Sequence, residues 1–169
     1  NEGGVARTLG QRNNNLGNIR INPANNWLGK IEDPDNVSGY EEFENIFFGV
    51  RALDIILRNY GKNSGVNTAR GLVQRYAPAS DNPESEGYIS SENYAQLIAD
   101  ATGVGVNDEI DLTDPETRNK IIPAITNLES REDITVDDIN VARNLTEKDT
   151  FSFKQEVIPP VPMQKPSSV

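Results

Sequence analysis

Amide and aromatic side chains gather in the first quarter of the chain. The run Arg-Asn-Asn-Asn-Leu-Gly-Asn-Ile-Arg occupies residues 12–20, and Trp27 and Tyr40 follow it. Each Asn side chain offers a hydrogen-bond donor and an acceptor, and an aromatic face packs against the apolar side of a sugar ring. This mixture suits the hydroxyl and amide groups of a carbohydrate. It equally suits a structural loop, because Asn tolerates left-handed backbone and caps its own turns.

A single carboxylic acid is the second feature that could carry a reaction. One protonated acid at the rim of an apolar helix can cleave a glycosidic bond, since partial burial raises its pKa. Glu129 ends such an apolar stretch, Ala-Ile-Thr-Asn-Leu-Glu-Ser over residues 124–130. The chain has 26 acidic residues, so an ordinary surface Glu is the alternative interpretation.

The other carboxylate clusters have simpler explanations. Residues 32–39 partly resemble a calcium loop, but Val37 occupies the expected third ligand position and no Glu stands at the twelfth. The acids between residues 108 and 114 fit a solvated patch at a helix start. No phosphate loop or dinucleotide motif appears. We therefore expect neither a metal site nor a cofactor.

Two residue types are missing altogether, Cys and His. Their absence excludes disulfides, zinc sites built on these ligands, a Cys nucleophile and a Ser-His-Asp triad. The 169 residues carry a net charge of −10, which opposes attraction to nucleic acid. No apolar run is long enough to span a bilayer, and the first residues lack a signal-peptide pattern.

The elements that must position these groups are mainly helical. Residues 1–45 are rich in Asn and Gly and predict an irregular, loop-rich lobe. A helix is predicted from residue 46 to 60, with Gly61 as its stop, because apolar residues recur there at spacings of four and three. Its predicted inward face consists of Ile46, Val50, Leu53, Leu57 and Tyr60.

Capping signals indicate further helices down the chain. Helices are predicted at about 68–76, 91–102, 115–128 and 136–144, with Ser90 or Ser91, Thr113 or Asp114, and Thr135 as N-caps. Pro123 lies inside the third of these and predicts a kink or a break into two helices. Tyr94 and Ile125 are expected to pack against the helix at 46–60.

The chain is predicted to form one domain followed by a tail. Residues 1–148 would make up the domain, with a loop-rich lobe at 1–45 and a helical lobe at 46–148. Residues 149–169 include Pro-Pro-Val-Pro and show no periodicity, which predicts an extended Pro-rich tail ordered only by contact with another chain.

The order of several motifs resembles a family of phage virion proteins with a lysozyme-like domain. The motifs are NNNLGNIR, WLG, GYEEFEN, GVRALDIILRNYG, TARGLVQRYAP, IDLTDP and AITNLES, within about residues 12–130. The family motif typically reads Asn-Asn-Pro-Gly-Asn-Ile/Leu-Arg, and here Leu16 stands where Pro is usual. The first motifs are also similar, more distantly, to glucosaminidase and lytic transglycosylase domains.

This resemblance implies a mainly α, lysozyme-like α+β fold, peptidoglycan glycan strands as the ligand and Glu129 as the catalytic acid. In the family a helix ending in His-Glu-Asn-Gly occupies this place, whereas here Leu128 replaces His and Ser130-Arg131 replace Asn-Gly. The rival acid is Glu2, which stands upstream of the Asn-rich motif. The substrate-binding residues implied by the resemblance are Asn14, Asn18, Arg20, Trp27 and Tyr40. A groove lined by Asn14, Asn18 and Trp27 is expected beside Glu129.

Two functions remain open from the sequence. The first is a virion-associated muramidase or lytic transglycosylase that opens the wall as the genome enters the host periplasm. The second is a structural or ejection protein of the particle that keeps the lysozyme-like scaffold without turnover. The acidic charge and the altered surroundings of Glu129 favour the second, and the Asn-rich motif with Trp27 favours the first. In either case the Pro-rich tail would contact other virion proteins.

Overall fold

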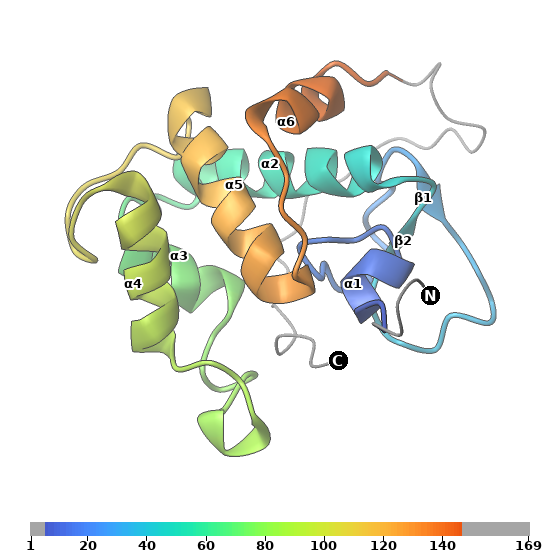
Figure 1. Cartoon of the computed structure of the whole chain (residues 1–169), viewed down its shortest axis with the longest axis horizontal. Helices are drawn as coiled ribbons and strands as arrows, with labels where there is room; N and C mark the ends of the chain where they lie inside the picture. Colours follow the sequence, from blue (N-terminus) through green and yellow to red (C-terminus); the bar gives the residue numbers. More distant parts are fainter. Residues whose placement is uncertain (1–5, 147–169) are drawn as a thin grey trace.

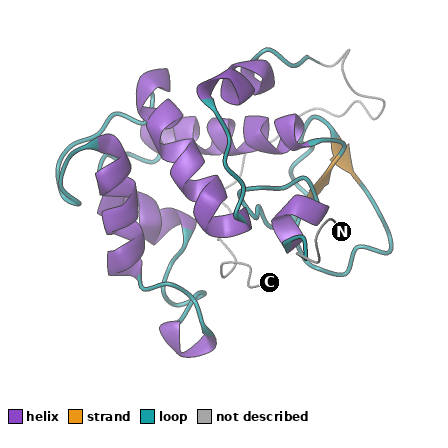
Figure 2. Ribbon diagram, in the orientation of Figure 1, coloured by secondary structure: helices purple, strands orange, loops and turns teal. Residues whose placement is uncertain are grey.

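The computed structural model describes residues 6–146, and the architecture over that range is mainly helical (Figures 1 and 2). The helices are α1 (Leu9–Arg12), α2 (Ile46–Asn63), α3 (Ala69–Tyr76), the 3-10 helix η2 (Glu84–Glu86), α4 (Ser91–Thr102), α5 (Pro115–Ser130) and α6 (Val136–Arg143). A two-stranded antiparallel sheet pairs β1 (Lys30–Ile31) with β2 (Glu42–Phe43). The predicted mainly α fold is confirmed.

The lobe before α2 is irregular, as the Asn and Gly content predicts. It holds the four-residue helix α1, the short sheet and an isolated bridge between Arg20 and Tyr40. Helix α1 was not predicted from the sequence. It begins at a capping box between Thr8 and Gln11. Figure 1 shows this lobe, coloured blue, beside the helices that make up the rest of the fold.

Helix α2 forms the central element of the core. Asn45 caps its N-terminus, and its apolar face buries Val50, Leu53 and Leu57 as predicted. The helix passes through Gly61 and ends at Asn63, so the predicted stop at Gly61 is wrong. A Cβ atom at Gly61 would lie 2.9 Å from the Leu112 side chain, which indicates that this glycine permits close packing rather than a turn.

The capping signals located the other helix starts correctly. Ser90, Asp114 and Thr135 cap α4, α5 and α6 with their side chains, and Gly103 ends α4 in the left-handed region at a φ of 80°. Helix α5 is continuous through Pro123, so of the two predicted outcomes, a kink or a break into two helices, the break does not occur. Ile121, Ile122 and Ile125 are all buried on the two sides of the proline, and their packing holds both halves in one helix.

The helices share one apolar core. Helix α2 packs against α5 and α6, and α4 packs against α3 and α5. The predicted contact of α2 with the helix containing Ile125 is therefore confirmed, whereas α4, with Tyr94, joins the core through α3 and α5. None of the described helices is both long and apolar enough to cross a membrane. Glu2 and the Pro-rich tail from residue 149 lie outside the described residues.

Candidate functional site

Glu129 lies in the last turn of α5, and its side chain has no exposed surface. The side-chain Nδ2 of Asn18 donates to Glu129 Oε1 at 2.8 Å and to the Glu129 carbonyl oxygen at 3.0 Å. The Tyr94 hydroxyl of α4 donates to Glu129 Oε2 at 3.3 Å. The predicted meeting of Asn18 with Glu129, across 111 positions of sequence, is therefore present.

The Asn-rich motif folds into a tight loop that presents Asn18 to the end of α5. Asn14 and Asn18 both adopt left-handed backbone, with φ of 54° and 53°, a region that Asn tolerates better than most residues. Asn15 is buried, accepts a hydrogen bond from the Ile19 backbone N–H and donates to the carbonyl oxygens of Ile19 and Glu41. The loop is thus held by its own side chains.

Further hydrogen bonds fasten this loop to the helical lobe. Ser130 Oγ donates to the Leu16 carbonyl at 2.8 Å, and Thr8 Oγ1 donates to the Ser130 carbonyl at 2.9 Å. From α3, the Tyr76 hydroxyl donates to the Gly17 carbonyl at 2.6 Å. A side chain at Gly17 would meet this hydroxyl, with its Cβ only 2.9 Å away. These contacts fix the loop against the C-terminal end of α5.

The surroundings of Glu129 favour the neutral form of its carboxyl group. Burial raises the pKa of Glu129 well above its ordinary value of 4.5, and the hydrogen bonds from Asn18 and Tyr94 oppose this rise only in part. Burial also raises the pKa of Tyr94 and of Tyr76, with the nearby Glu129 adding to both shifts. Burial raises the pKa of Tyr40 to about 12, although Arg20 opposes the shift. The shift favours the protonated form of Glu129, which is the form that a general acid needs.

The remaining predicted binding residues differ in what they do. Arg20 stacks over the ring of Tyr40, with 5.4 Å between the guanidinium carbon and the ring centroid. Tyr40 lies near enough to Glu129 for the carboxyl to affect its pKa. Asn14 instead donates from Nδ2 to the Phe43 carbonyl at 3.0 Å, so its amide N–H group is used inside the lobe.

Trp27 is a core residue with no exposed surface. The predicted stacking of a sugar on Trp27 is therefore wrong for this conformation, because its faces are covered by protein. The prediction that Glu129 stands at the rim of an open groove meets the same difficulty, since Glu129 is also fully covered. Burial of the Trp27 ring in the apolar core stabilises the loop lobe, and a buried ring cannot serve as a surface for a sugar.

Sequence reasoning missed the hydroxyl groups around Glu129. Tyr94 was expected only as an inward-facing apolar residue, yet its hydroxyl contacts the acid. A Tyr rather than a Phe on the buried face of a helix is a signal for such a partner, because a buried phenol needs a hydrogen bond. Among the described residues, no group of three or more His, Cys, Asp and Glu is placed to hold a metal ion.

Comparison with known proteins gives one informative similarity. No family model matches the chain. The chain is 32% identical over 126 residues to "Protein P5" of Pseudoalteromonas phage PM2, a match that covers 72% of this chain and 70% of that protein.

Proposed function

The chain belongs to the family of Protein P5 of Pseudoalteromonas phage PM2, a bacteriophage protein, and we propose that it is a virion-associated, lysozyme-like protein that cleaves peptidoglycan glycan strands during genome delivery. The observation that carries this proposal is the buried acid Glu129 at the end of α5, whose pKa is raised by burial and which accepts a hydrogen bond from Asn18 of the Asn-rich motif. These are the two groups that the resemblance to phage lysozyme-like proteins assigns to one site.

A neutral carboxylic acid supplies the proton that cleavage of a glycosidic bond requires. In the proposed reaction Glu129 donates its proton to the glycosidic oxygen, and the bond breaks through a transition state with oxocarbenium character. The sugar carbon is then captured by water in a hydrolase, or by the C6 hydroxyl of the same sugar in a lytic transglycosylase, and the proton of that nucleophile returns to the Glu129 carboxylate. Asn18 and Tyr94 hold the carboxyl group in one orientation through their bonds to Oε1 and Oε2. Because Glu129 has no exposed surface, the glycan reaches it only after covering side chains move aside.

The second candidate function is a structural or ejection protein of the virion that does not cleave the wall. The full burial of Glu129 and of Trp27 favours this alternative, because neither side chain can touch a ligand in the present conformation. Under this proposal the bonds among Asn18, Tyr94 and Glu129 serve only to join the loop lobe to the helices. In both proposals the tail from residue 149 contacts other virion proteins.

Zymography on purified peptidoglycan, with mass analysis of the released fragments, separates the two functions. Anhydro-muropeptides would indicate a lytic transglycosylase, and reducing ends would indicate a hydrolase. Glu129→Gln keeps the shape and the contact with Asn18 but removes the acid, so cleavage should fall by roughly a hundredfold or more. Absence of release by the wild-type chain would contradict the cleavage proposal and leave the structural one.

Two control variants make the Glu129 result specific. Glu116→Gln removes a carboxylate from the exposed first turn of the same helix and should leave cleavage unchanged. Tyr94→Phe removes one hydrogen bond but keeps the acid, so it should reduce cleavage less than Glu129→Gln. Circular dichroism of each variant checks that the helices persist.

A further inference from the structure

A hollow of about 560 Å³ lies in the loop lobe beside the strand-like segments 19–21 and 39–41. These segments pair through the bonds from Ile21 N–H to the Gly39 carbonyl and from Glu41 N–H to the Ile19 carbonyl. Successive side chains of a strand point to opposite faces. Arg20 and Tyr40 therefore face away from Ile21 and Glu41, and it is Ile21 and Glu41 that line the hollow.

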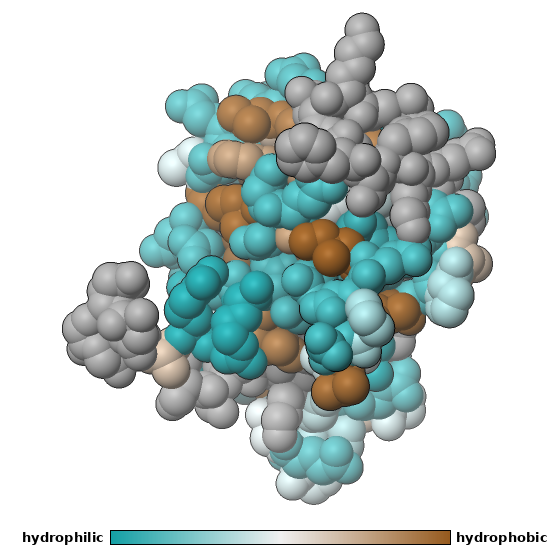
Figure 3. Space-filling model, turned by 90° about the vertical axis from the view of Figure 1, so that its right-hand side faces the viewer, coloured by the Kyte–Doolittle hydropathy of each residue, from teal (hydrophilic) through white to brown (hydrophobic). Residues whose placement is uncertain are grey.

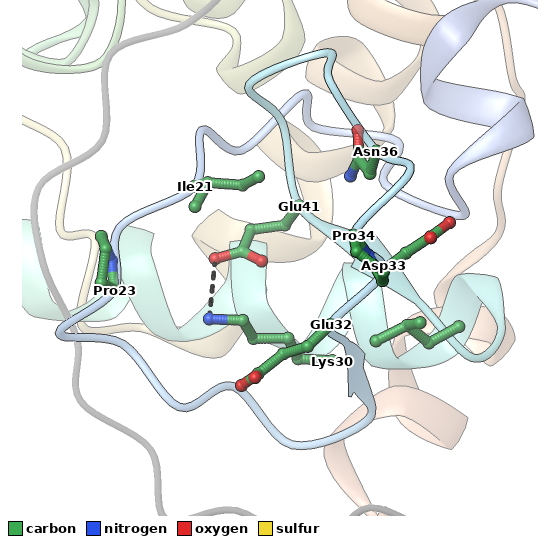
Figure 4. A pocket seen from close by; sticks show the side chains of 9 residues that line it. Ile21, Pro23, Lys30, Glu32, Asp33, Pro34, Asn36 and Glu41 are labelled. Atoms are coloured by element: carbon green, nitrogen blue, oxygen red, sulfur yellow. Dashed lines mark ion pairs between the residues drawn. The ribbon is translucent and has the colours of Figure 1, made fainter.

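The floor of the hollow is a buried pair of opposite charges, Lys30 and Glu41, which are 6% and 1% exposed. Lys30 Nζ lies 3.5 Å from Glu41 Oε2 and donates to the Asn25 carbonyl at 2.9 Å. Apart from this ion pair with Lys30, Glu41 Oε2 has no hydrogen-bond donor among the described residues. Figure 4 shows the two charged ends facing each other, with Ile21 and Pro23 beside them.

This floor offers two different places for hydrogen bonds. Because Lys30 Nζ is 3.5 Å from Glu41 Oε2, this oxygen is compensated by charge but can still accept a shorter hydrogen bond from a ligand. Burial also raises the pKa of Glu41, a rise that Lys30 opposes and the negative charge of Glu32 increases. Since Glu41 and Lys30 are almost fully covered, a ligand reaches them only after side chains at the rim move aside. A donor group, above all a cation, is then favoured at Oε2, while the ammonium of Lys30 can donate to an anionic group.

A cation alone would lie close to Lys30 and be repelled by it, and an anion alone would lie close to Glu41 and be repelled there. A group that carries both charges on adjacent atoms avoids both conflicts. The α-amino-acid group, with an ammonium and a carboxylate on one carbon, has this arrangement. The walls formed by Ile21, Pro23 and Ile31 are apolar and suit a short aliphatic chain behind such a group.

We propose that this hollow binds the free α-amino-acid end of a diamino acid in the peptide stem of peptidoglycan, with its ammonium on Glu41 and its carboxylate on Lys30. The choice of peptidoglycan as the polymer rests on the proposed function. The choice of an α-amino-acid group as the ligand rests on the charged and apolar side chains that line the hollow. The paired segments 19–21 and 39–41 separate two places in the molecule. Glu41 is on the face toward the hollow, and Arg20 and Tyr40 are on the opposite face, toward Glu129. An extended three-residue stem spans about 10 Å, which is the reach that the proposal allows between a glycan and the hollow.

The test measures binding of a short stem peptide to the full chain by isothermal titration calorimetry. The probe is a tripeptide that ends in diaminopimelate with its side-chain amino acid group free. Two modified probes, one acetylated at that amine and one amidated at that carboxylate, should each bind at least about tenfold more weakly, because each loses a charge-assisted hydrogen bond. A linear diamine, which carries cations without the carboxylate, should also bind more weakly than the tripeptide.

Variants locate the binding in this hollow. Glu41→Gln and Lys30→Met should each weaken binding by about tenfold or more. Since either change breaks a buried ion pair and can destabilise the fold, Glu32→Gln provides a test on the exposed rim and should weaken binding of the ammonium.

Asp33→Asn is the matched control: its carboxylate is turned away from the Lys30–Glu41 pair in Figure 4, and Asn keeps the acceptor for the Asp35 backbone N–H. Binding by Asp33→Asn should equal that of the wild type.

Three results would overturn the inference: no binding of the tripeptide at millimolar concentration, equal binding of the acetylated or amidated probe, or binding that Glu32→Gln and Asp33→Asn weaken equally. The two proposals fail separately. Peptide binding without wall cleavage would contradict the proposed function and support this binding site. Wall cleavage without peptide binding would support the proposed function and contradict this binding site.

Discussion

Glu129 shows how strongly the surroundings of one side chain set its chemistry. Its carboxyl group accepts hydrogen bonds from Asn18 and Tyr94, and both bonds favour the ionised form. Full burial acts in the opposite direction and is the larger effect on the pKa. The pKa of the acid is therefore raised, although its neighbours are donors that would suit a carboxylate.

The raised pKa of Glu129 makes a pH dependence of stability testable. The folded state holds the proton above pH 4.5, where the unfolded chain releases it, so the free energy of unfolding should fall as the pH rises from about 4.5 towards the pKa of the folded state. The slope from one such group is about 1.4 kcal/mol per pH unit. Glu129→Gln should remove this contribution, and urea unfolding of both proteins from pH 4.5 to 8 would measure the difference. An exposed control, Glu84→Gln, should keep the wild-type slope.

A second test at this scale separates the two roles of Asn18, its hydrogen bonds and its left-handed backbone. Asn18→Gly keeps access to a φ near 53° but removes the donor to Glu129, so it should cost about 1 to 3 kcal/mol. Asn18→Ala removes the donor and also strains the backbone, which should cost about 1 kcal/mol more. Equal unfolding free energies for the two variants would contradict the backbone argument.

Residue chemistry explains what the sequence predicted at the site and what it did not. Glu129 and Asn18 were recognisable because their motifs resemble those of a known family. Trp27 was misinterpreted because an aromatic residue in an Asn-rich loop fits a sugar platform and a buried core equally well. Lys30 and Glu41 were not recognised as a pair, since only the folded lobe shows that both are buried side by side.

Helix boundaries were more predictable than helix interiors. The starts of α4, α5 and α6 depend on local capping side chains, which the sequence shows directly. The continuity of α5 through Pro123 and of α2 through Gly61 depends on packing against distant residues such as Leu112. Such contacts override local propensity, so the predicted stop at Gly61 and the predicted break at Pro123 do not occur.

Gly49 provides a test of the packing between α2 and the Asn-rich loop. A Cβ atom at this position would clash with the Asn14 backbone carbonyl, which cannot swing away as a side chain can. Gly49→Ala should therefore destabilise the fold by about 1 to 3 kcal/mol despite the better helix propensity of Ala. Gly71→Ala in α3 is the control, because its nearest contact is the Thr68 side-chain oxygen at 3.1 Å, and its effect should stay within about 1 kcal/mol. Thermal unfolding compares the two.

On the scale of the whole molecule, charged side chains play different parts on the surface and in the core. Figure 3 shows the hydrophobic side chains of one face in small groups separated by hydrophilic ones, as expected for a surface with a strongly negative net charge. Inside, Asp54 of α2 accepts hydrogen bonds from Arg118 of α5 at 2.7 Å and from Arg143 of α6 at 2.9 Å. This buried network joins three helices across the core, and no local pattern in the sequence indicates it.

The network predicts a specific pattern of coupled stabilities. Asp54→Leu leaves Arg118, which is 4% exposed, buried without its partner, and should cost about 3 to 5 kcal/mol. Arg118→Met leaves Asp54 with Arg143 as its partner, so it should cost less than the Asp54 change. The double variant Asp54→Leu/Arg118→Met leaves no charge of this buried pair unpaired, and its loss should be clearly smaller than the two single losses added together. Urea unfolding of all four proteins measures the coupling free energy. Strict additivity would mean that α2 and α5 are held by apolar packing alone and that the ion pair contributes nothing to joining them.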